Sequence, residues 1–155
     1  MPELPPSSPQ LPRRTDFVVL QKMETRWADN DAYGHVNNVV YYEFFDSAVN
    51  RHLIEHGALQ IGSSPVIGLV VESQCKYFSS IGFPDAVTVG LRVAHLGNSS
   101  VRYEIAIFRN ADDTASALGH FVHVYVDRAS NRPTPIPDGT RAVLAALMPP
   151  TEAPH

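Results

Sequence analysis

The sequence is poor in cysteine and in long apolar runs, and each shortage excludes a class of protein. Cys75 is the only cysteine among 155 residues, so an intrachain disulfide and a zinc site built from several thiolates are excluded. A single thiol is most simply a packing residue. No apolar run approaches the roughly 20 residues that span a bilayer, and residues 1–14 lack the hydrophobic centre of a signal peptide. We therefore expect a soluble, cytoplasmic protein without a membrane partner.

Positive charge is also sparse, and it is not clustered. The chain has 12 Lys and Arg residues against 16 Asp and Glu residues, which gives a formal net charge of -4. A protein that binds nucleic acid usually shows a basic patch or stripe. Because the basic residues are scattered along this chain, we expect no nucleic-acid partner.

Proline is nearly missing from the middle of the chain. Of 13 prolines, five lie within residues 2–12 and six within residues 133–154. Proline lacks a backbone donor and rarely joins helices or sheet ladders, and the total length suits one domain. The distribution predicts three parts, which are a disordered Pro-rich tail over 1–14, a folded domain over 15–128, and a Pro-rich segment over 129–155 with room for a short helix.

Hydrophobic periodicity predicts one strand followed by one long helix. Residues 17–27 alternate between apolar and polar side chains, as in a half-buried strand. Residues 39–53 place apolar side chains at the i, i+3, i+4 spacing of a helix face. Asn37 or Asn38 suits the N-cap and Gly57 suits the C-terminal stop, so we expect a helix of about 17 residues.

Four further strands follow with short connections. The last of them is apolar on both faces, as in a central strand that is covered at least in part on each side. Short connections favour antiparallel pairing. The sequence therefore predicts an α+β fold, a five-stranded antiparallel sheet curled around one long helix. The four expected strands span residues 66–78, 87–93, 101–107 and 114–127, and the short C-terminal helix is expected over 140–148.

The densest polar cluster, residues 26–38, immediately precedes the expected helix. A helix N-terminus offers unpaired N–H groups and a partial positive charge, which stabilise an anion or a developing oxyanion. One interpretation is catalytic, with Asp31 as nucleophile or general base on an acyl group and the backbone N–H of Asn38 holding the carbonyl oxygen. The other is structural, with Asp29 and Asp31 only bonding nearby amides. Local chemistry leaves both open.

The same residues resemble the signature of a known family. The pattern Asp29-x-Asp31-x-x-Gly34-His35-Val36-Asn37-Asn38-x-x-Tyr41, with Phe44 or Phe45 further on, is similar to that of hotdog-fold acyl-CoA thioesterases of the 4-hydroxybenzoyl-CoA thioesterase type. Residues 72–78, 83–85 and 96–100 fall where similar proteins have a second strand, a turn and a hairpin. The resemblance covers residues 15–128.

The resemblance implies a hotdog fold that hydrolyses an acyl-CoA thioester to free acid and CoA, with no cofactor and no metal. It implies that Asp31 is the catalytic carboxylate, that Asp29 is structural, and that the Asn38 N–H, together with that of Val39, binds the oxyanion. Similar proteins commonly build the site between two subunits, so we expect a homodimer or homotetramer. The expected substrate-binding residues are Tyr33, Gly34, His35, Val39, Tyr41, Tyr42 and Phe45.

Three alternatives accompany this hypothesis. A hotdog fold does not fix an activity, so a non-catalytic module that binds an acyl thioester or another small apolar ligand stays open. His52-Leu53-Ile54-Glu55-His56 spells an inverse zinc-peptidase motif, but it lies at the end of the helix, where a histidine also interacts favourably with the helix terminus. His120 and His123 are a third candidate, as ligands of one metal ion. They are three apart on a strand, so they point to opposite faces and cannot chelate one ion from regular geometry.

Overall fold

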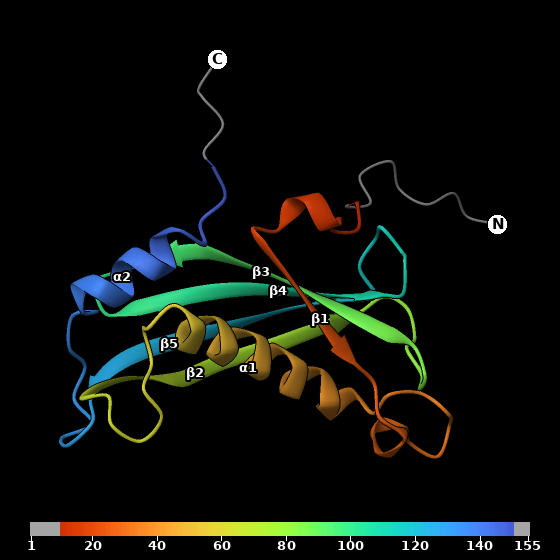
Figure 1. Ribbon diagram of the computed structural model, residues 1–155, viewed down its shortest axis with the longest axis horizontal. Helices are drawn as coiled ribbons and strands as arrows, with labels where there is room; N and C mark the ends of the chain where they lie inside the picture. The colour runs from red at the N-terminus through yellow and green to blue at the C-terminus, as the bar shows by residue number, and fades with distance from the viewer. Residues whose placement is uncertain (1–9, 151–155) are drawn as a thin grey trace.

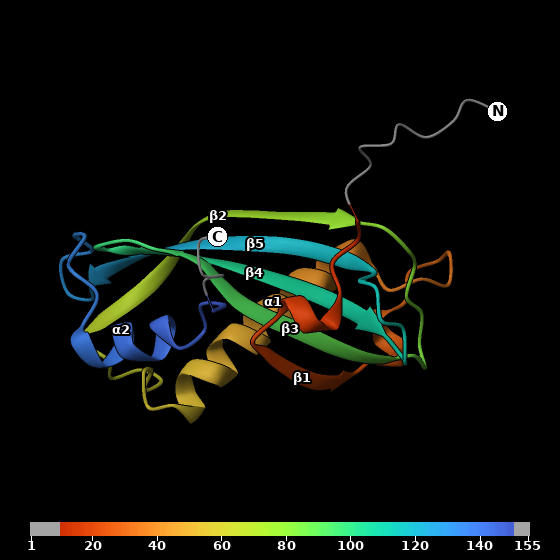
Figure 2. The same cartoon turned by 90° about the horizontal axis from the view of Figure 1, so that it is seen from above.

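A five-stranded antiparallel sheet carries one long helix across one of its faces (Figures 1 and 2). The computed structural model describes residues 10–150. The sheet order is β1-β3-β4-β5-β2, with every neighbouring pair antiparallel. This confirms the predicted hotdog architecture. The strands are β1 (Val19–Glu24), β2 (Val66–Tyr77), β3 (Ala86–Leu96), β4 (Ser100–Arg109) and β5 (Ala117–Asp127), and the helices are η1 (Arg14–Asp16), η2 (Trp27–Asp29), α1 (Asn38–Glu55) and α2 (Asp138–Ala145).

Helix α1 begins and ends at the predicted signals. Asn37 is the N-cap, and its side chain accepts a hydrogen bond from the Val39 N–H at 3.3 Å. At the other end Gly57 adopts a φ of 73°, the left-handed conformation that favours glycine after a helix. The buried residues of α1 form its apolar face, and they are Val40, Tyr41, Phe44, Phe45, Ala48, Val49, His52 and Leu53.

The inner face of the sheet packs against this side of α1. Alternate residues of β3 and β4 are fully enclosed, with Leu91, Tyr103 and Ile105 each 0% exposed. Strand β5 is apolar on both faces, yet its burial alternates from Ala117 to Tyr125, so the outer-face residues before Val126 are only half-buried. A Cβ at Gly119 would overlap the ring of Phe45, which means that glycine is what lets the helix approach β5 so closely.

The outer face is covered only in part. Phe17, which follows η1, packs edge-on against Phe108 with 5.9 Å between ring centroids, and Figure 2 shows η1 on the side of the sheet opposite α1. Elsewhere this face carries charge, including the ion pair of Arg92 with Glu104 at 3.1 Å. The outer face of the sheet is therefore apolar where η1 and Phe17 cover it, and polar over the part that they leave uncovered.

The two Pro-rich ends differ in what the structure describes. Most of the tail expected over 1–14 lies outside the described residues, although the Pro12 carbonyl accepts a hydrogen bond from the Ala115 N–H at 2.8 Å. The segment after β5 packs on the domain, and Ile136, Leu144 and Leu147 join the main core. The predicted short helix is therefore real and contributes apolar contacts. Among residues 10–150 no helix is long and apolar enough to cross a membrane.

Candidate active site

Asp29 fixes the loop between β1 and α1. Its carboxylate is 2% exposed and accepts hydrogen bonds from the Arg26 backbone N–H at 2.7 Å and from the Arg26 guanidinium at 2.8 Å. Its carbonyl accepts from the Asn37 N–H at 2.8 Å, so the start of the loop is tied to the helix cap. All of these bonds are internal to the loop, and Asp29 therefore has a structural role.

Asp31 is held differently, with one carboxylate oxygen bound and the other free. Its Oδ1 accepts from the Tyr33 N–H at 2.8 Å and the His35 N–H at 3.3 Å, and its own N–H donates to the His35 carbonyl at 2.8 Å. This turn fixes the plane of the carboxylate. Within residues 10–150 no hydrogen bond reaches Asp31 Oδ2, so this oxygen stays available to a ligand.

Asp31 lines a cleft of about 360 Å³ between the loop, the first turn of α1 and the end of β2. The cleft is open on one side and its walls mix polar and apolar side chains. Such a concave site with a few polar groups is the usual form of a small-molecule site. The lining residues are Asp31, His35, Val36, Asn38, Tyr41, Tyr77, Phe78, Ser79 and Ser80.

The start of α1 leaves one backbone donor free at this cleft. The Val39 N–H donates to the Asn37 side chain and the Val40 N–H donates to the Asn37 carbonyl at 2.9 Å. The Asn38 N–H has no acceptor among the described residues. Because the helix dipole adds positive charge at this end, the Asn38 N–H is the group best placed to bind an oxyanion.

Tyr77, at the end of β2, closes the cleft over the helix start. Its hydroxyl donates to the Asn38 carbonyl at 3.1 Å, and its ring meets that of Tyr41 edge-on with 4.9 Å between centroids. Tyr41 is 3% exposed, and burial raises the pKa of its hydroxyl, which stays neutral at physiological pH. The two rings therefore give the cleft an uncharged aromatic wall beside Asn38.

Main-chain contacts dock the Asp31 loop on the segment after β2. The Val36 N–H donates to the Ile81 carbonyl at 2.7 Å, and a Cβ at Gly82 would lie 2.9 Å from the Gly34 carbonyl oxygen. Only glycine fits at position 82 without moving the loop. Asn30 adds a side-chain contact, because its Oδ1 accepts from the Phe83 N–H at 3.0 Å.

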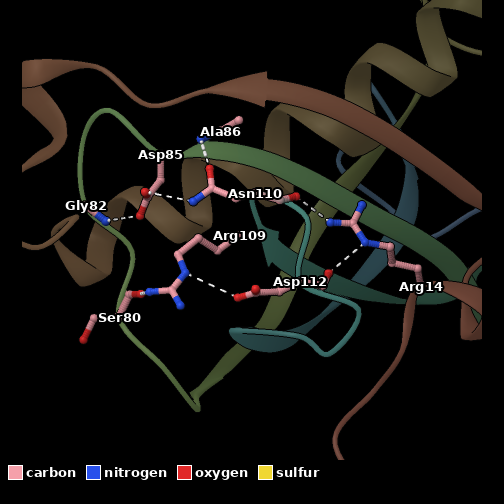
Figure 3. Close-up of polar contacts among 8 residues, drawn as sticks. All are labelled: Arg14, Ser80, Gly82, Asp85, Ala86, Arg109, Asn110 and Asp112. Atoms are coloured by element: carbon pink, nitrogen blue, oxygen red, sulfur yellow. Dashed lines mark hydrogen bonds and ion pairs between the residues drawn. The ribbon is translucent and has the colours of Figure 1, made fainter.

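A polar network behind the cleft holds the Ser80 segment in place (Figure 3). Arg109 donates to the Ser80 carbonyl at 3.1 Å, and Asp85 accepts from the Gly82 N–H at 3.1 Å. The Asn110 side chain donates to Asp85 at 3.0 Å and accepts from the Ala86 N–H at 2.9 Å. The turn between β4 and β5 thereby anchors one wall of the cleft.

Asn110 sits in this network with a φ of 49°, a left-handed conformation that asparagine tolerates better than most residues. Its carbonyl accepts from Arg14 at 2.8 Å, and Arg14 also donates to the Asp112 carbonyl at 2.8 Å. Figure 3 shows Arg14 reaching this turn from the start of the chain. The described part of the N-terminal segment therefore supports the cleft indirectly.

Four of the predicted site residues line the cleft, namely Asp31, His35, Asn38 and Tyr41. Gly34 lies in the docked loop with a φ of 81°. The other predicted substrate-binding residues lie elsewhere in the single chain. Tyr33 and Val39 are exposed, at 85% and 57%, whereas Tyr42 and Phe45 pack in the core against Phe121.

Sequence reasoning missed the wall formed by Tyr77, Phe78, Ser79 and Ser80. Tyr77 ends β2, 39 positions after Asn38 in the chain, and the other three residues follow it, so no local pattern links this wall to the helix start. The sequence does signal that the strand ends here, because the strand pattern gives way to the polar pair at 79–80. Only the fold shows that this strand end lies over the helix start.

The other candidate groups do not join the cleft. The His52 and His56 rings stack 4.1 Å apart, and within the part of the chain described no third His, Cys, Asp or Glu completes a metal site with them. His120 lies on the outer face against Glu72 at 2.9 Å, whereas His123 is buried on the inner face. Burial raises the pKa of the Cys75 thiol to about 11, as suits a packing residue.

Comparisons with known proteins give the family. The model of the thioesterase-like superfamily matches residues 25–144. The crystal structure of the PA5185 protein from Pseudomonas aeruginosa strain PAO1 is 55% identical, with a TM-score of 0.87 over 90% of this chain and 97% of that chain.

Two more distant structures share the fold. The BH1999 gentisyl-coenzyme A thioesterase is 23% identical, with a TM-score of 0.72 over 81% of this chain and 99% of that chain. The SAV2348 protein from Staphylococcus aureus, solved in complex with CoA, is 17% identical, with a TM-score of 0.77 over 87% of this chain and 88% of that chain. The family match spans most of the chain, including the Asp31 loop and α1. The protein therefore belongs to the thioesterase-like superfamily.

Proposed function

We propose that the cleft hydrolyses an acyl-CoA thioester to the free acid and CoA, with Asp31 as nucleophile or general base. The observation that carries this proposal is the pairing of two groups at one cleft. Among residues 10–150, one carboxylate oxygen of Asp31 and the Asn38 N–H at the helix start have no hydrogen-bond partner. Ester and thioester hydrolysis needs both a base or nucleophile and an oxyanion donor.

The reaction consumes one water and needs no further reactant. Asp31 Oδ2 either takes a proton from water as it attacks the thioester carbon, or attacks that carbon itself and forms an anhydride that water then opens. In both routes the C–S bond breaks and the thiolate leaves as CoA, which takes up a proton. The Asn38 N–H and the helix dipole stabilise the oxyanion, and such a donor typically contributes ~10²- to 10³-fold in rate.

Coenzyme A is the thiol that the comparisons support. A gentisyl-coenzyme A thioesterase shares this fold, and so does SAV2348, whose structure was solved in complex with CoA. In the described chain the cleft opens to solvent between the Asp31 loop and the end of β2. The thioester end of the substrate would occupy this opening, with the nucleotide of CoA outside it.

The working unit in this proposal is a homodimer joined along β2. The two edge strands of the sheet differ in length and character. Strand β1 has six residues and exposes Lys22 and Glu24, whereas β2 has 12 residues and exposes Val70 at 50% and Val71 at 60%. The first half of β2 is apolar, and a long edge strand with unpaired backbone groups is the usual place where a second chain adds. Two copies would extend the sheet by antiparallel β2–β2 pairing.

The catalytic proposal is tested by Asp31→Asn. The side chains are nearly isosteric, and both keep an oxygen for the Tyr33 and His35 N–H groups, so we expect the fold to survive. Release of free thiol from a panel of acyl-CoAs is expected to fall by ~10²- to 10⁴-fold, the contribution of a general base. Asp138→Asn, on the surface of α2, is the matched control and should keep full turnover.

Turnover at the wild-type rate in Asp31→Asn would contradict the catalytic role of Asp31. Tight binding of acyl-CoA by the wild-type protein without release of thiol from any member of the panel would instead favour the non-catalytic binding module. Calorimetry of the same panel measures that binding, so one set of ligands separates the two functions.

The dimer is tested by placing a charge on the β2 edge. Val71 lies near the middle of β2, so Val71→Lys would bring two like charges together across the dimer axis. We expect this variant to sediment as a monomer. Leu20→Lys places the same charge on the β1 edge, where Leu20 is 46% exposed, and should leave the dimer intact. A dimer that survives Val71→Lys unchanged would contradict pairing along β2.

A further inference from the structure

A second, smaller cavity lies at the far end of α1 from Asp31. It measures about 50 Å³ and lies between the C-terminal half of α1 and the first residues of β2. Its walls are mostly apolar, but Asn50, His123 and Tyr125 bring polar groups to it. This volume suits one small functional group better than a whole ligand.

His123 is the unusual group in this wall. It is 4% exposed, and neither nitrogen of its ring has a hydrogen-bond partner within residues 10–150. Nε2 is fully enclosed, and a Cβ at Gly68 would lie 3.2 Å from Nδ1, so only a glycine leaves this edge of the ring uncrowded. A buried polar group without a partner costs roughly 1–3 kcal/mol. Native proteins contain few such groups, and each one needs an explanation, such as a ligand that bonds to it.

The Tyr103 ring on the neighbouring strand β4 backs the imidazole from outside the cavity wall. It meets the ring of His123 edge-on with 5.2 Å between centroids. Burial lowers the pKa of His123 to about 4, so its imidazole is neutral at physiological pH and offers one donor and one acceptor. The cavity therefore presents an uncharged hydrogen-bonding end.

An aromatic row leads from the first turns of α1 toward this polar end. The Tyr42 ring stacks on Phe121 with 6.4 Å between centroids, and Phe121 stacks on His123 at 5.9 Å. Both Phe121 and His123 lie on the inner face of β5. Because Phe121 is itself buried, at 4% exposed, this stack fixes the orientation of the imidazole in the cavity wall.

The proposed dimer would place this cavity next to the cleft of the other copy. Antiparallel pairing of two identical strands aligns the last residues of one with the first residues of the other. Tyr77 ends β2 and lines the cleft, while residues 66–68 begin β2 and line the cavity. A two-fold axis normal to the sheet keeps both helices on the same side. The thioester cleft of one chain and the His123 cavity of its partner would then form one continuous site.

We propose that His123 selects acyl groups that carry a hydroxyl or carbonyl on their distal part, which it binds from the subunit opposite the one that supplies Asp31. This inference rests on the proposed thioesterase function and on the β2–β2 dimer. The polar substituent would take up a hydrogen bond at Nδ1, the ring nitrogen beside Gly68 in the cavity wall, while the chain before it lies on apolar walls. An unsubstituted chain of equal length would leave the imidazole unpaired.

The test compares matched pairs of straight-chain acyl-CoAs and their ω-hydroxyacyl counterparts over a series of chain lengths. We expect the hydroxylated member to be preferred in kcat/KM by about tenfold at the length that reaches the cavity, as one hydrogen bond to a buried group provides. His123→Leu should abolish that preference, so that both members of each pair are hydrolysed with the same kcat/KM. His123→Asn, whose amide nitrogen falls near the position of Nδ1, should retain part of it.

His120→Leu is the matched control, because it makes the same change on the outer face of the same strand. It should keep the hydroxyl preference. A wild-type protein that hydrolyses both members of every pair equally well would overturn the inference and leave the proposed function standing. If no thiol is released at all, the proposed function fails, and calorimetric affinities for the same pairs still decide whether His123 binds the hydroxyl.

Mixed dimers test which subunit supplies the imidazole. In a dimer of one Asp31→Asn chain and one His123→Leu chain, a site that spans both subunits keeps one complete copy, with Asp31 from one chain and His123 from the other. The His123→Leu protein alone hydrolyses without a preference, so mixing the two variants should restore the hydroxyl preference. If each site lies within one chain, no complete site exists, and mixing that restores no preference would overturn the assignment of His123 to the opposite subunit.

Discussion

Lowering the pH from 7 to 5 should cost the folded protein about 2 kcal/mol of unfolding free energy through His123 alone. The ordinary pKa of histidine is 6.5, and in the fold burial lowers the pKa of His123 to about 4, with the charge of Asp46 opposing that shift. The unfolded chain therefore binds this proton more readily than the folded one. The stability is fully present above pH 6.5 and is lost as the pH falls toward 4.

The magnitude follows from the two pKa values. One pKa unit corresponds to about 1.4 kcal/mol, and at pH 5 the unfolded histidine is almost fully protonated while the folded one is not. At pH 4 the loss approaches about 3 kcal/mol. Burial also lowers the pKa of His52, so this residue adds a loss of the same sign.

Urea unfolding of the wild type and of His123→Leu at pH 7 and pH 5, at one protein concentration, isolates the His123 contribution. The contribution of His52 is present in both proteins and cancels. We expect the wild type to lose about 2 kcal/mol more than the variant between these pH values. Phe108→Leu, a change without a titrating group in the separate core cluster around Phe17, should lose as much as the wild type. An equal loss in wild type and His123→Leu would refute the reasoning.

Two further changes test the packing and the helix start. Gly119→Ala places a methyl group against the Phe45 ring and should lower the unfolding free energy by about 1–3 kcal/mol, whereas Gly139→Ala, with no atom within 4 Å of the added Cβ, should be neutral or stabilising in the same urea titration. Asn37→Ala removes the cap of the Val39 N–H and should cost about 1 kcal/mol; thiol release should also fall, because the helix start frays beside the Asn38 donor. A fully active Asn37→Ala protein would contradict that coupling.

The elements of this fold were predictable where their signals are local. Helix α1 follows from Asn37, Gly57 and the apolar spacing between them, and the strands follow from alternation and turn residues. Burial along β5 was harder to predict, because its outer residues are apolar too and only the position of α1 decides which face is enclosed. The packing of Ile136 onto the core was also hidden, since one apolar residue among prolines carries no periodic signal.

The residues of the candidate site also fall into two groups, those with a local sequence signal and those brought together only by the fold. Asp31 and Asn38 stand close together in the sequence beside a helix start, so chemistry and spacing indicate them directly. Tyr77 reaches Asn38 only because β2 lies at the sheet edge next to α1, which is a consequence of strand order. His123 was recognised as a strand residue facing away from His120, but its surroundings are set by residues of α1, β2 and β4, which no local pattern reveals.

The loop that carries Asp31 is attached through main-chain atoms, by the Val36 N–H to the Ile81 carbonyl, the Asn37 N–H to the Asp29 carbonyl and the Asp31 N–H to the His35 carbonyl. Backbone bonds of this kind do not depend on which side chains surround them. Mutation can therefore exchange wall residues such as Phe78 without displacing the carboxylate or the helix start. Under the proposed function, the scaffold would thus separate the groups that do the chemistry from the walls that choose the acyl group, and new substrate preferences would be open to evolution, or to an engineer, at little cost to the reaction itself.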